Sequence, residues 1–243
     1  MTPGSLCLAI ESATPVASVA LLRGEQVLAE EQGPSGQHHS ENLLPMVDRA
    51  LTGSRLSLSD LDFFAISIGP GAFTSLRIGL ATLKGLAFGR GQLVVPVSTL
   101  QALALSGKRA GRLKGSLPVV PMLDARRGEV YAAAYDMDQL AEAEAVERLP
   151  SSVYSAEDLM GALPNGGQLI GGGAEVVLSA GLSASDAPFL RETEGVTVPD
   201  AVSVGLLGQA SMAAGQGVPV DSLVPRYVRR AEAEAQRISR PLE

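Results

Sequence analysis

The sequence of 243 residues has no tryptophan, a single cysteine and only two histidines. One cysteine excludes an intramolecular disulfide and a cysteine-rich metal site, and the apolar run around Cys7 predicts a buried packing residue. The histidines, His38 and His39, are adjacent, whereas a helical metal pair needs two ligands four residues apart on one face. We therefore predict that the chain holds no metal.

Basic residues are also fewer than acidic ones, and the formal net charge is -7 at pH 7. An acidic chain lacks the broad basic face that binding to a phosphate backbone requires, so direct binding to a nucleic acid is disfavoured. The basic cluster from Arg226 to Arg237 is diluted by Glu232 and Glu234. We interpret this cluster as the solvated end of a helix rather than as an RNA contact.

Long apolar runs are missing as well. No run approaches the length of a membrane span, and the first residues show no basic region followed by an apolar one. These absences predict a cytoplasmic protein without a membrane partner. Apolar residues still make up 46% of the chain, which is enough for a hydrophobic core and argues against disorder.

Apolar periodicity predicts strands and helices in turn along the first part of the chain. Three strands are expected between residues 6 and 32. Helical spacing of leucine and valine then predicts a helix at about 40–51. Within it, Pro45 requires either that the regular part starts close to Asn42 or that an earlier turn is kinked. A buried strand at 63–68 leads into a second, glycine-bearing helix.

The alternation continues through the rest of the chain. A strand at 93–98 precedes a helix that Ser98 or Thr99 can cap. Two strands around the polar turn Asp124–Glu129 are next, then a capped helix, a strand with a triple-glycine turn, and a last helix from Ser203. Antiparallel strands followed by alternating strands and helices indicate an α/β fold with mixed sheets flanked by helices.

The polar, glycine-containing connector Lys108–Ser116 predicts a boundary between two lobes. We predict an N-terminal lobe over residues 1–107, completed by a helix from 200–216, and a second, smaller lobe over 108–199. Residues 217–243 would then form a C-terminal segment.

Three turns could hold an anion, and each also has a purely structural explanation. Gly69-Pro70-Gly71 precedes a helix but lacks the lysine and hydroxyl residue of a Walker loop, and it fits no dinucleotide fingerprint. The turn Asp124–Tyr131 could bind an anion through its arginines or form an internal salt bridge. Gly171–Gly173 could admit a nucleotide or only supply permissive backbone. A G-x-S-x-G elbow is absent too, so the sequence predicts no catalytic residue and no cofactor.

The helix after Gly71 contains glycines that an isolated helix disfavours, because each interior glycine costs about 0.8–1 kcal/mol relative to alanine. Its larger apolar residues fall on one face, suited to packing on a sheet: Leu76, Leu80, Leu83 and Ala87. Its small residues form a second, narrow stripe: Ser75, Gly79, Thr82, Gly85 and Gly89. Such a stripe lets another helix approach closely. Periodicity alone leaves open whether that helix belongs to this chain or to another polypeptide.

Five segments, in this order, together resemble the TsaB family, also called YeaZ: LAIESATPVASVAL, HHSENLLP, SIGPGAFTSLRIGLATLKGLA, DARRGEVYAAAY and PRYVRRAEAE. The resemblance covers most of the chain and is loose from Glu142 to Pro199. It implies a two-lobed fold similar to that of actin, the heat-shock ATPases and the sugar kinases. It also implies a bacterial cytoplasmic protein that is a non-catalytic paralogue and partner of TsaD, the metal-bearing subunit that transfers a threonylcarbamoyl group to tRNA.

The resemblance implies further partners. With TsaD and the ATPase TsaE, the family makes threonylcarbamoyladenosine next to the anticodon of certain tRNAs, so this chain would meet tRNA only through the complex. The family pairs through its first two helices, either with TsaD or with itself. On that basis we predict these partner-binding residues: Ser40, Leu43, Leu44, Val47, Ser75, Ile78, Gly79, Thr82 and Gly85.

This chain lacks residues that related proteins use to bind a metal or a nucleotide. TsaD-like proteins bind their metal with two histidines four apart, at a place where this chain has Val97–Leu103 and no histidine. The first phosphate loop of the superfamily has aspartate and then glycine two residues later, whereas this chain has Glu11-Ser12-Ala13. Ser75 stands where the family usually has glycine, and it is still small. We therefore favour a scaffold for TsaD, with a nucleotide-binding ATPase or small hydrolase of the same superfamily as the alternative.

Overall fold

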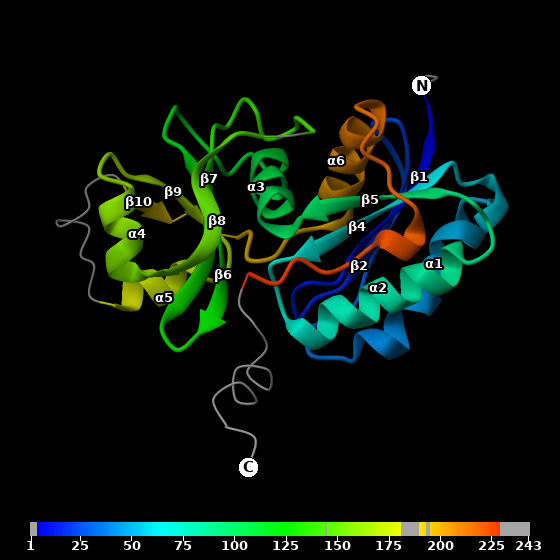
Figure 1. The fold of residues 1–243 in the computed structure, drawn as a ribbon, viewed down its shortest axis with the longest axis horizontal. Helices are drawn as coiled ribbons and strands as arrows, with labels where there is room; N and C mark the ends of the chain where they lie inside the picture. Colours follow the sequence, from blue (N-terminus) through cyan, green and yellow to red (C-terminus); the bar gives the residue numbers. More distant parts are fainter. Residues whose placement is uncertain (1–3, 144, 181–189, 193–194, 229–243) are drawn as a thin grey trace, which may run out of the picture.

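The computed structural model describes residues 4–143, 145–180, 190–192 and 195–228, which form two lobes, each built on a five-stranded sheet (Figure 1). In the first lobe the strand order is β3-β2-β1-β4-β5. β1 pairs antiparallel with β2 and parallel with β4, which in turn pairs parallel with β5. The strands are β1 (Leu6–Glu11), β2 (Ser18–Arg23), β3 (Gln26–Gln32), β4 (Phe63–Gly69) and β5 (Leu93–Ser98).

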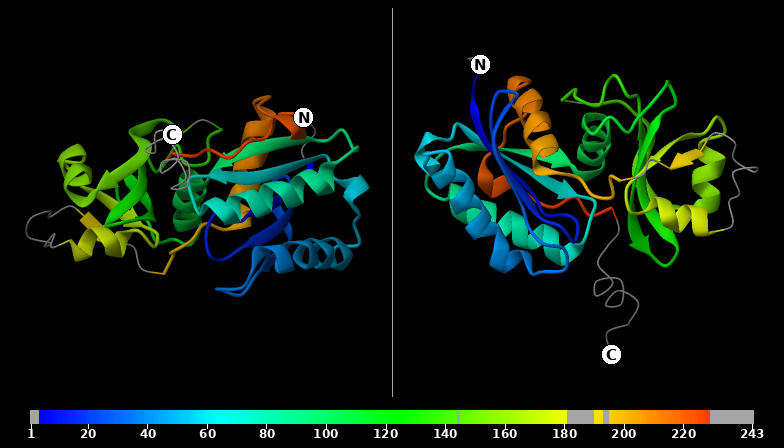
Figure 2. Two further views of the ribbon diagram at one scale, coloured as in Figure 1. Left: turned by 60° about the horizontal axis from the view of Figure 1, so that its bottom comes forward. Right: turned by 180° about the vertical axis from the view of Figure 1, so that it is seen from behind.

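Helices cover both faces of the first sheet (Figure 2). Side chains alternate along β1, so that Leu8 and Ile10 pack beneath α1 and α2, whereas Cys7 and Ala9 lie in the core beneath α3 and α6. Both cores are mainly aliphatic, although Phe63 and Tyr135 lie in one of them and Phe64 lies in the other. The helices are α1 (His39–Gly53), α2 (Phe73–Ala87), α3 (Thr99–Arg109) and α6 (Ala201–Ala213), with short 3-10 turns η1 (Leu58–Asp60) and η2 (Val220–Ser222).

The second lobe has the strand order β10-β9-β6-β7-β8. α4 and α5 pack on one face of this sheet, and α3 packs on the other, so α3 contacts both sheets. The elements are β6 (Val119–Arg126), β7 (Glu129–Tyr135), β8 (Glu147–Ser155), α4 (Ala156–Ala162), β9 (Gly167–Ile170), α5 (Ala174–Ser179) and β10 (Leu190–Glu192).

The two sheets repeat one topology. Three antiparallel strands, β1 to β3 or β6 to β8, are followed by two parallel strands that extend the sheet from its first strand. This arrangement confirms the predicted α/β class with mixed sheets flanked by helices. The boundaries drawn at residues 107 and 199 stay a prediction, because one core cluster contains residues of both sheets.

Local signals explain where several helices begin. The Ser98 hydroxyl accepts a hydrogen bond from the Gln101 backbone N–H and caps α3, and Ser155 caps α4 in the same way. α1 starts at His39, one residue before the predicted start at about residue 40, and carries Pro45 inside it. Pro45 is exposed, so the helical carbonyl that it leaves without an N–H donor can be hydrated.

The end of the described chain also differs from the prediction. Residues 226–228 are not helical, whereas the sequence predicts a helix end at the basic cluster. The rest of that cluster, residues 229–237, lies outside the described residues.

Candidate functional site

The turn that leads into α2 is shaped by close backbone contacts. Gly69 has a φ of 119°, which favours glycine. A Cβ on Gly71 would lie 2.5 Å from the Ala13 carbonyl oxygen, and that oxygen accepts a hydrogen bond of 2.8 Å from the Ala72 backbone N–H. The turn therefore joins the start of α2 tightly to the β1–β2 loop, which accounts for its glycines without a ligand.

The inner face of α2 packs on the first sheet, as its leucine spacing predicts. Leu76, Leu80 and Leu83 are buried. Gly79 is buried with them, and a Cβ at this position would lie 2.0 Å from the Ser12 Oγ and 2.9 Å from the Ser12 Cβ. Gly79 is therefore small because the β1–β2 loop of the same chain packs against it. The structure corrects its assignment to a partner surface.

The outer face of α2 is open, and we define it by Arg77, Ala81, Gly85 and Phe88. A Cβ on Gly85 would meet no atom of the described residues within 4 Å, and the Phe88 side chain is 81% exposed. Ala81 lies four residues before Gly85 on the same side of the helix and is exposed. Sequence reasoning missed Ala81 and Phe88, although their spacing from Gly85 places them on one face.

The remaining predicted partner residues are partly at the surface and partly buried. Ser75, Ile78 and Thr82 are half-buried at the border of the outer face of α2. On the neighbouring helix α1, Ser40 and Leu44 are exposed, and Leu44 is exposed by 53%.

Two predicted partner residues of α1 point inward. Leu43 and Val47 are buried in the core of the first lobe, so the structure corrects their assignment as surface contacts. The helical spacing that singled them out is the spacing of the buried face.

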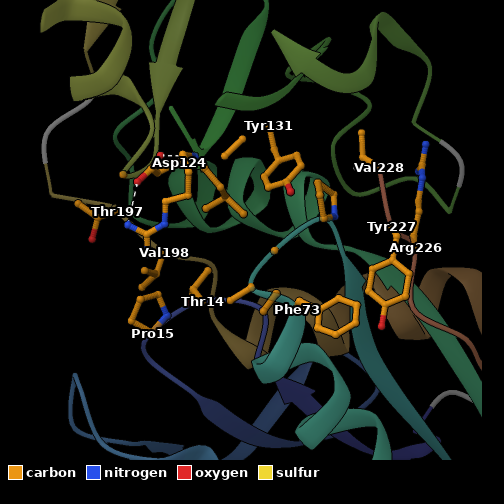
Figure 3. A pocket seen from close by; sticks show the side chains of 18 residues that line it. Thr14, Pro15, Phe73, Asp124, Tyr131, Thr197, Val198, Arg226, Tyr227 and Val228 are labelled. Atoms are coloured by element: carbon orange, nitrogen blue, oxygen red, sulfur yellow. Dashed lines mark hydrogen bonds and ion pairs between the residues drawn. The ribbon is translucent and has the colours of Figure 1, made fainter. Parts of the chain in front are cut away.

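A cleft of about 670 Å³ lies between the two lobes. Figure 3 shows Phe73 and Tyr227 side by side at one end of this interlobe cleft, with Pro15, Thr197 and Val198 toward the other. It is lined by the β1–β2 loop, the start of α2, the β6–β7 turn and the C-terminal residues 226–228. All three turns that the sequence singled out as anion sites or tight turns thus contribute to one cleft.

The charged turn of the second lobe is an internal salt bridge, at least in part. The Arg126 guanidinium lies 3.6 Å from the Asp124 carboxylate, and the Arg126 backbone N–H donates to the same side chain at 2.7 Å. Arg126 and Arg127 both have a positive φ, with Gly128 following in the same region, so they form a tight hairpin turn at the rim of the cleft.

Glu11 closes the first strand beneath the cleft and is fully buried. Its Oε1 accepts a hydrogen bond of 2.6 Å from the Ala13 backbone N–H, and so fixes the β1–β2 loop. Burial raises the pKa of Glu11 to about 7, and the charge of Asp200 adds to the shift. The His39 Nε2 lies 2.7 Å from the Thr14 carbonyl oxygen and holds the same loop from α1. Both side chains therefore position the loop rather than project into the cleft.

Comparison with known proteins identifies relatives of this chain. The family model "TsaD: tRNA N6-adenosine threonylcarbamoyltransferase" matches residues 30–176. A protein of Escherichia coli K12 named tRNA threonylcarbamoyladenosine biosynthesis protein TsaB is 42% identical over 133 residues, which are 54% of this chain and 55% of that protein. A Bacillus subtilis 168 protein of the same name is 34% identical over 128 residues, which are 53% and 54% of the two chains. The chain thus spans about half the length of the curated relatives it matches.

A solved structure matches almost the whole chain. YeaZ from Pseudomonas aeruginosa has a TM-score of 0.76 and 30% sequence identity, covering 92% of this chain and 99% of that one.

Proposed function

This chain belongs to the TsaB/YeaZ family, and from that premise we propose that it takes part in tRNA threonylcarbamoyladenosine biosynthesis as a non-catalytic partner of TsaD. In this proposal TsaD transfers the threonylcarbamoyl group, TsaE supplies the ATPase, and tRNA reaches the chain only through the complex. The names of the relatives support the pathway. The outer face of α2 is the observation that supports a scaffold role.

The open position at Gly85 is what points to a partner on this face. A glycine inside an exposed helix costs about 1 kcal/mol relative to alanine, and among the described residues no neighbouring group occupies the space that Gly85 leaves. A partner helix would use that space, because a small residue lets two helix backbones approach closely. Phe88 adds a large exposed apolar side chain at the end of the same face, and large aromatic side chains commonly anchor interfaces.

The neighbouring helix α1 would widen the contact. α1 packs beside α2, and its exposed Leu44 and Ser40 complete the predicted surface. The revised partner surface is thus Ser40, Leu44, Ser75, Ile78, Thr82 and Gly85, extended by Arg77, Ala81 and Phe88. The same surface would serve a homodimer, in competition with TsaD.

The start of α3 supports a role without chemistry. TsaD-like proteins are expected to carry their metal-binding histidines at the place of Val97–Leu103, and this segment contains no histidine. None of the helices in the described part of the chain has the length and hydropathy of a membrane span. We propose a cytoplasmic location on the strength of the tRNA substrate.

A reconstituted reaction tests the proposal. TsaD, TsaE, ATP, tRNA and a threonylcarbamoyl donor would be incubated with and without this chain. Mass spectrometry of the digested tRNA would measure threonylcarbamoyladenosine. We expect the modified nucleoside only when both TsaD and this chain are present. Equal yield without this chain would contradict the proposal.

The interlobe cleft favours a second candidate, a nucleotide-binding ATPase or small hydrolase. Its volume of about 670 Å³ lies within the range of small-molecule pockets, and Arg126 and Arg226 line it. Titration with adenine nucleotides, followed by an assay for phosphate release, separates the two candidates. Micromolar binding with turnover by the isolated chain would favour the enzyme.

A further inference from the structure

Residues 223–228, which follow η2, form a strap across the first lobe. The orange-red end of the described chain in Figure 1 runs over the first lobe to the boundary between the lobes. Leu223 anchors it in the core of the first lobe. The Arg226 backbone N–H donates to the Ile68 carbonyl oxygen at 2.7 Å, and a Cβ on Gly69 would lie 2.7 Å from the Arg226 carbonyl oxygen. The strap is thus held directly against the end of β4.

An aromatic and cationic stack fixes the strap to α2. The rings of Tyr227 and Phe73 are stacked with centroids 4.9 Å apart (Figure 3). The Arg77 guanidinium lies 3.8 Å from the Phe73 ring centroid, and its Nε donates a hydrogen bond of 2.9 Å to the Tyr227 hydroxyl. Arg77 thereby contacts both rings, and its own position is on the outer face of α2. One side chain connects the strap to the proposed partner surface.

Two cavities border the strap at Arg226. Arg226 lines the interlobe cleft and, with Ser98, Gln101 and Ser211, a second cavity of about 210 Å³. These cavities lie near the carboxyl ends of the parallel strands β4 and β5, where ligands bind in open α/β sheets. Because one residue lines both, lifting the strap would join them into one groove.

We propose that the strap is a latch that couples the outer face of α2 to the interlobe cleft. With Tyr227 seated on Phe73 and Arg77, the latch is closed and the two cavities stay apart. A partner that lies along Ala81 and Gly85 meets Arg77 one turn earlier on the same face, and by covering Arg77 and Tyr227 it holds the latch closed. The partner half of this inference rests on the proposed function, whereas the latch itself is a property of this chain.

Thiol labelling tests the latch without a partner. Cys7 is fully buried, and burial raises its pKa, so it is a poor competitor for a maleimide reagent. A Ser211→Cys thiol would report access to the second cavity. We expect Tyr227→Ala to raise its labelling rate about tenfold, because loss of the stack frees the strap to open locally. Tyr227→Phe keeps the ring and loses the hydrogen bond to Arg77. We expect its labelling rate to lie between those of the chain with Tyr227 and of Tyr227→Ala.

A control variant tests whether the labelling rate rises only because the whole chain is destabilised. Tyr154→Ala removes an aromatic side chain of the second lobe, away from the strap, and should leave the Ser211→Cys rate unchanged. Equal labelling rates of the Ser211→Cys thiol in the chain with Tyr227 and in Tyr227→Ala would overturn the latch proposal. A rise of the same size in Tyr154→Ala would overturn it too.

Fluorescence tests the coupling to a partner. The chain contains no tryptophan, so Tyr227→Trp places a single indole reporter on the strap. We expect saturating TsaD to reduce acrylamide quenching of this reporter by about twofold, because an interface excludes solvent from a covered ring. Unchanged or stronger quenching in a complex confirmed by size-exclusion chromatography would overturn the coupling and leave the proposed function standing. Absence of any complex would overturn both, while the labelling result would still decide the latch.

Discussion

The two lobes share one strand topology, yet the helices between their parallel strands differ in length. α2 and α5 occupy equivalent places between the two parallel strands of their sheets, but α2 has 15 residues and α5 has 6. Only α2 is long enough to pack one face on the sheet and present a second face over several turns. Topology therefore sets where each helix lies, and the length and outer residues of α2 are what support the partner surface proposed for it.

The acidic residues near the ends of the first strands of the two sheets differ in burial. Glu11 in β1 is fully buried, whereas the Asp124 side chain in β6 is 42% exposed and pairs with Arg126. Burial makes Glu11 a structural acid that holds the β1–β2 loop, while Asp124 stays at the rim of the cleft. Substitutions made in matched pairs, one in each lobe, can break or sharpen this comparison.

The largest expected effect is on the pH dependence of stability. Glu11 has a pKa of about 7 in the folded chain and 4.5 as its ordinary value, so folding takes up a proton between these pH values. The free energy of unfolding should therefore fall by about 3 kcal/mol as the pH rises through this window. Glu11→Gln removes this slope, and Asp124→Asn keeps it. Urea denaturation from pH 4.5 to 8 measures both, and a wild-type slope in Glu11→Gln would refute the assignment.

The next prediction compares the stability effect of substituting the buried Gly79 with that of substituting the exposed Gly161. Gly79→Ala would place a Cβ 2.0 Å from the Ser12 Oγ, so we expect it to lower the free energy of unfolding by about 1–3 kcal/mol. In Gly161→Ala in α4 the new Cβ would meet no atom within 4 Å in the part of the chain that the structure describes, so the variant should raise stability by up to about 1 kcal/mol. Urea midpoints at constant m-value measure the difference. Equal shifts in the two variants would show that Gly79 is not held by packing.

A smaller effect concerns the exposed aromatic residue after α2. Phe88→Ala should weaken binding to TsaD about tenfold, which corresponds to about 1.4 kcal/mol, because it removes a large apolar contact. Val146→Ala, which truncates an exposed apolar residue of the second lobe, should leave the affinity unchanged. Calorimetric titration measures both. Similar losses in the two variants would count against a partner surface on the first lobe.

The smallest effect is on the stability of the isolated chain at Gly85. Gly85→Ala should raise the free energy of unfolding by about 0.5–1 kcal/mol, since the position has helical backbone and open space around it. Thermal unfolding measures the gain. A loss of stability would mean that Gly85 has a structural role in this chain.

Much of the fold follows from local patterns in the sequence. The strands of the first sheet, the cap at Ser98, and the hairpin around Asp124 are each set by a few neighbouring residues. How Pro45 is accommodated in α1 could not be predicted in the same way, because a proline inside a helix is tolerated more easily where it is exposed. Exposure depends on packing, which a local pattern does not contain.

The candidate site was harder to predict because its contacts are distant along the chain. Gly79 is fixed by Ser12 on another element, and periodicity shows only that Gly79 is small. Arg77 and Tyr227 are 150 residues apart, so no spacing rule could join them. Helical spacing chose Leu43 correctly as part of a face, but burial shows that the face is the inner one.

The measurement that tests the central claim most directly is a titration of TsaD from the same organism into three forms of this chain. The wild type and Gly161→Leu, which places a bulky residue on α4 of the second lobe, should bind TsaD equally. Gly85→Leu fills the space proposed for the partner helix while leaving the chain folded, so its affinity should fall about tenfold or more. Equal binding by all three, with the Gly85→Leu variant folded by circular dichroism, would contradict a partner surface on the outer face of α2.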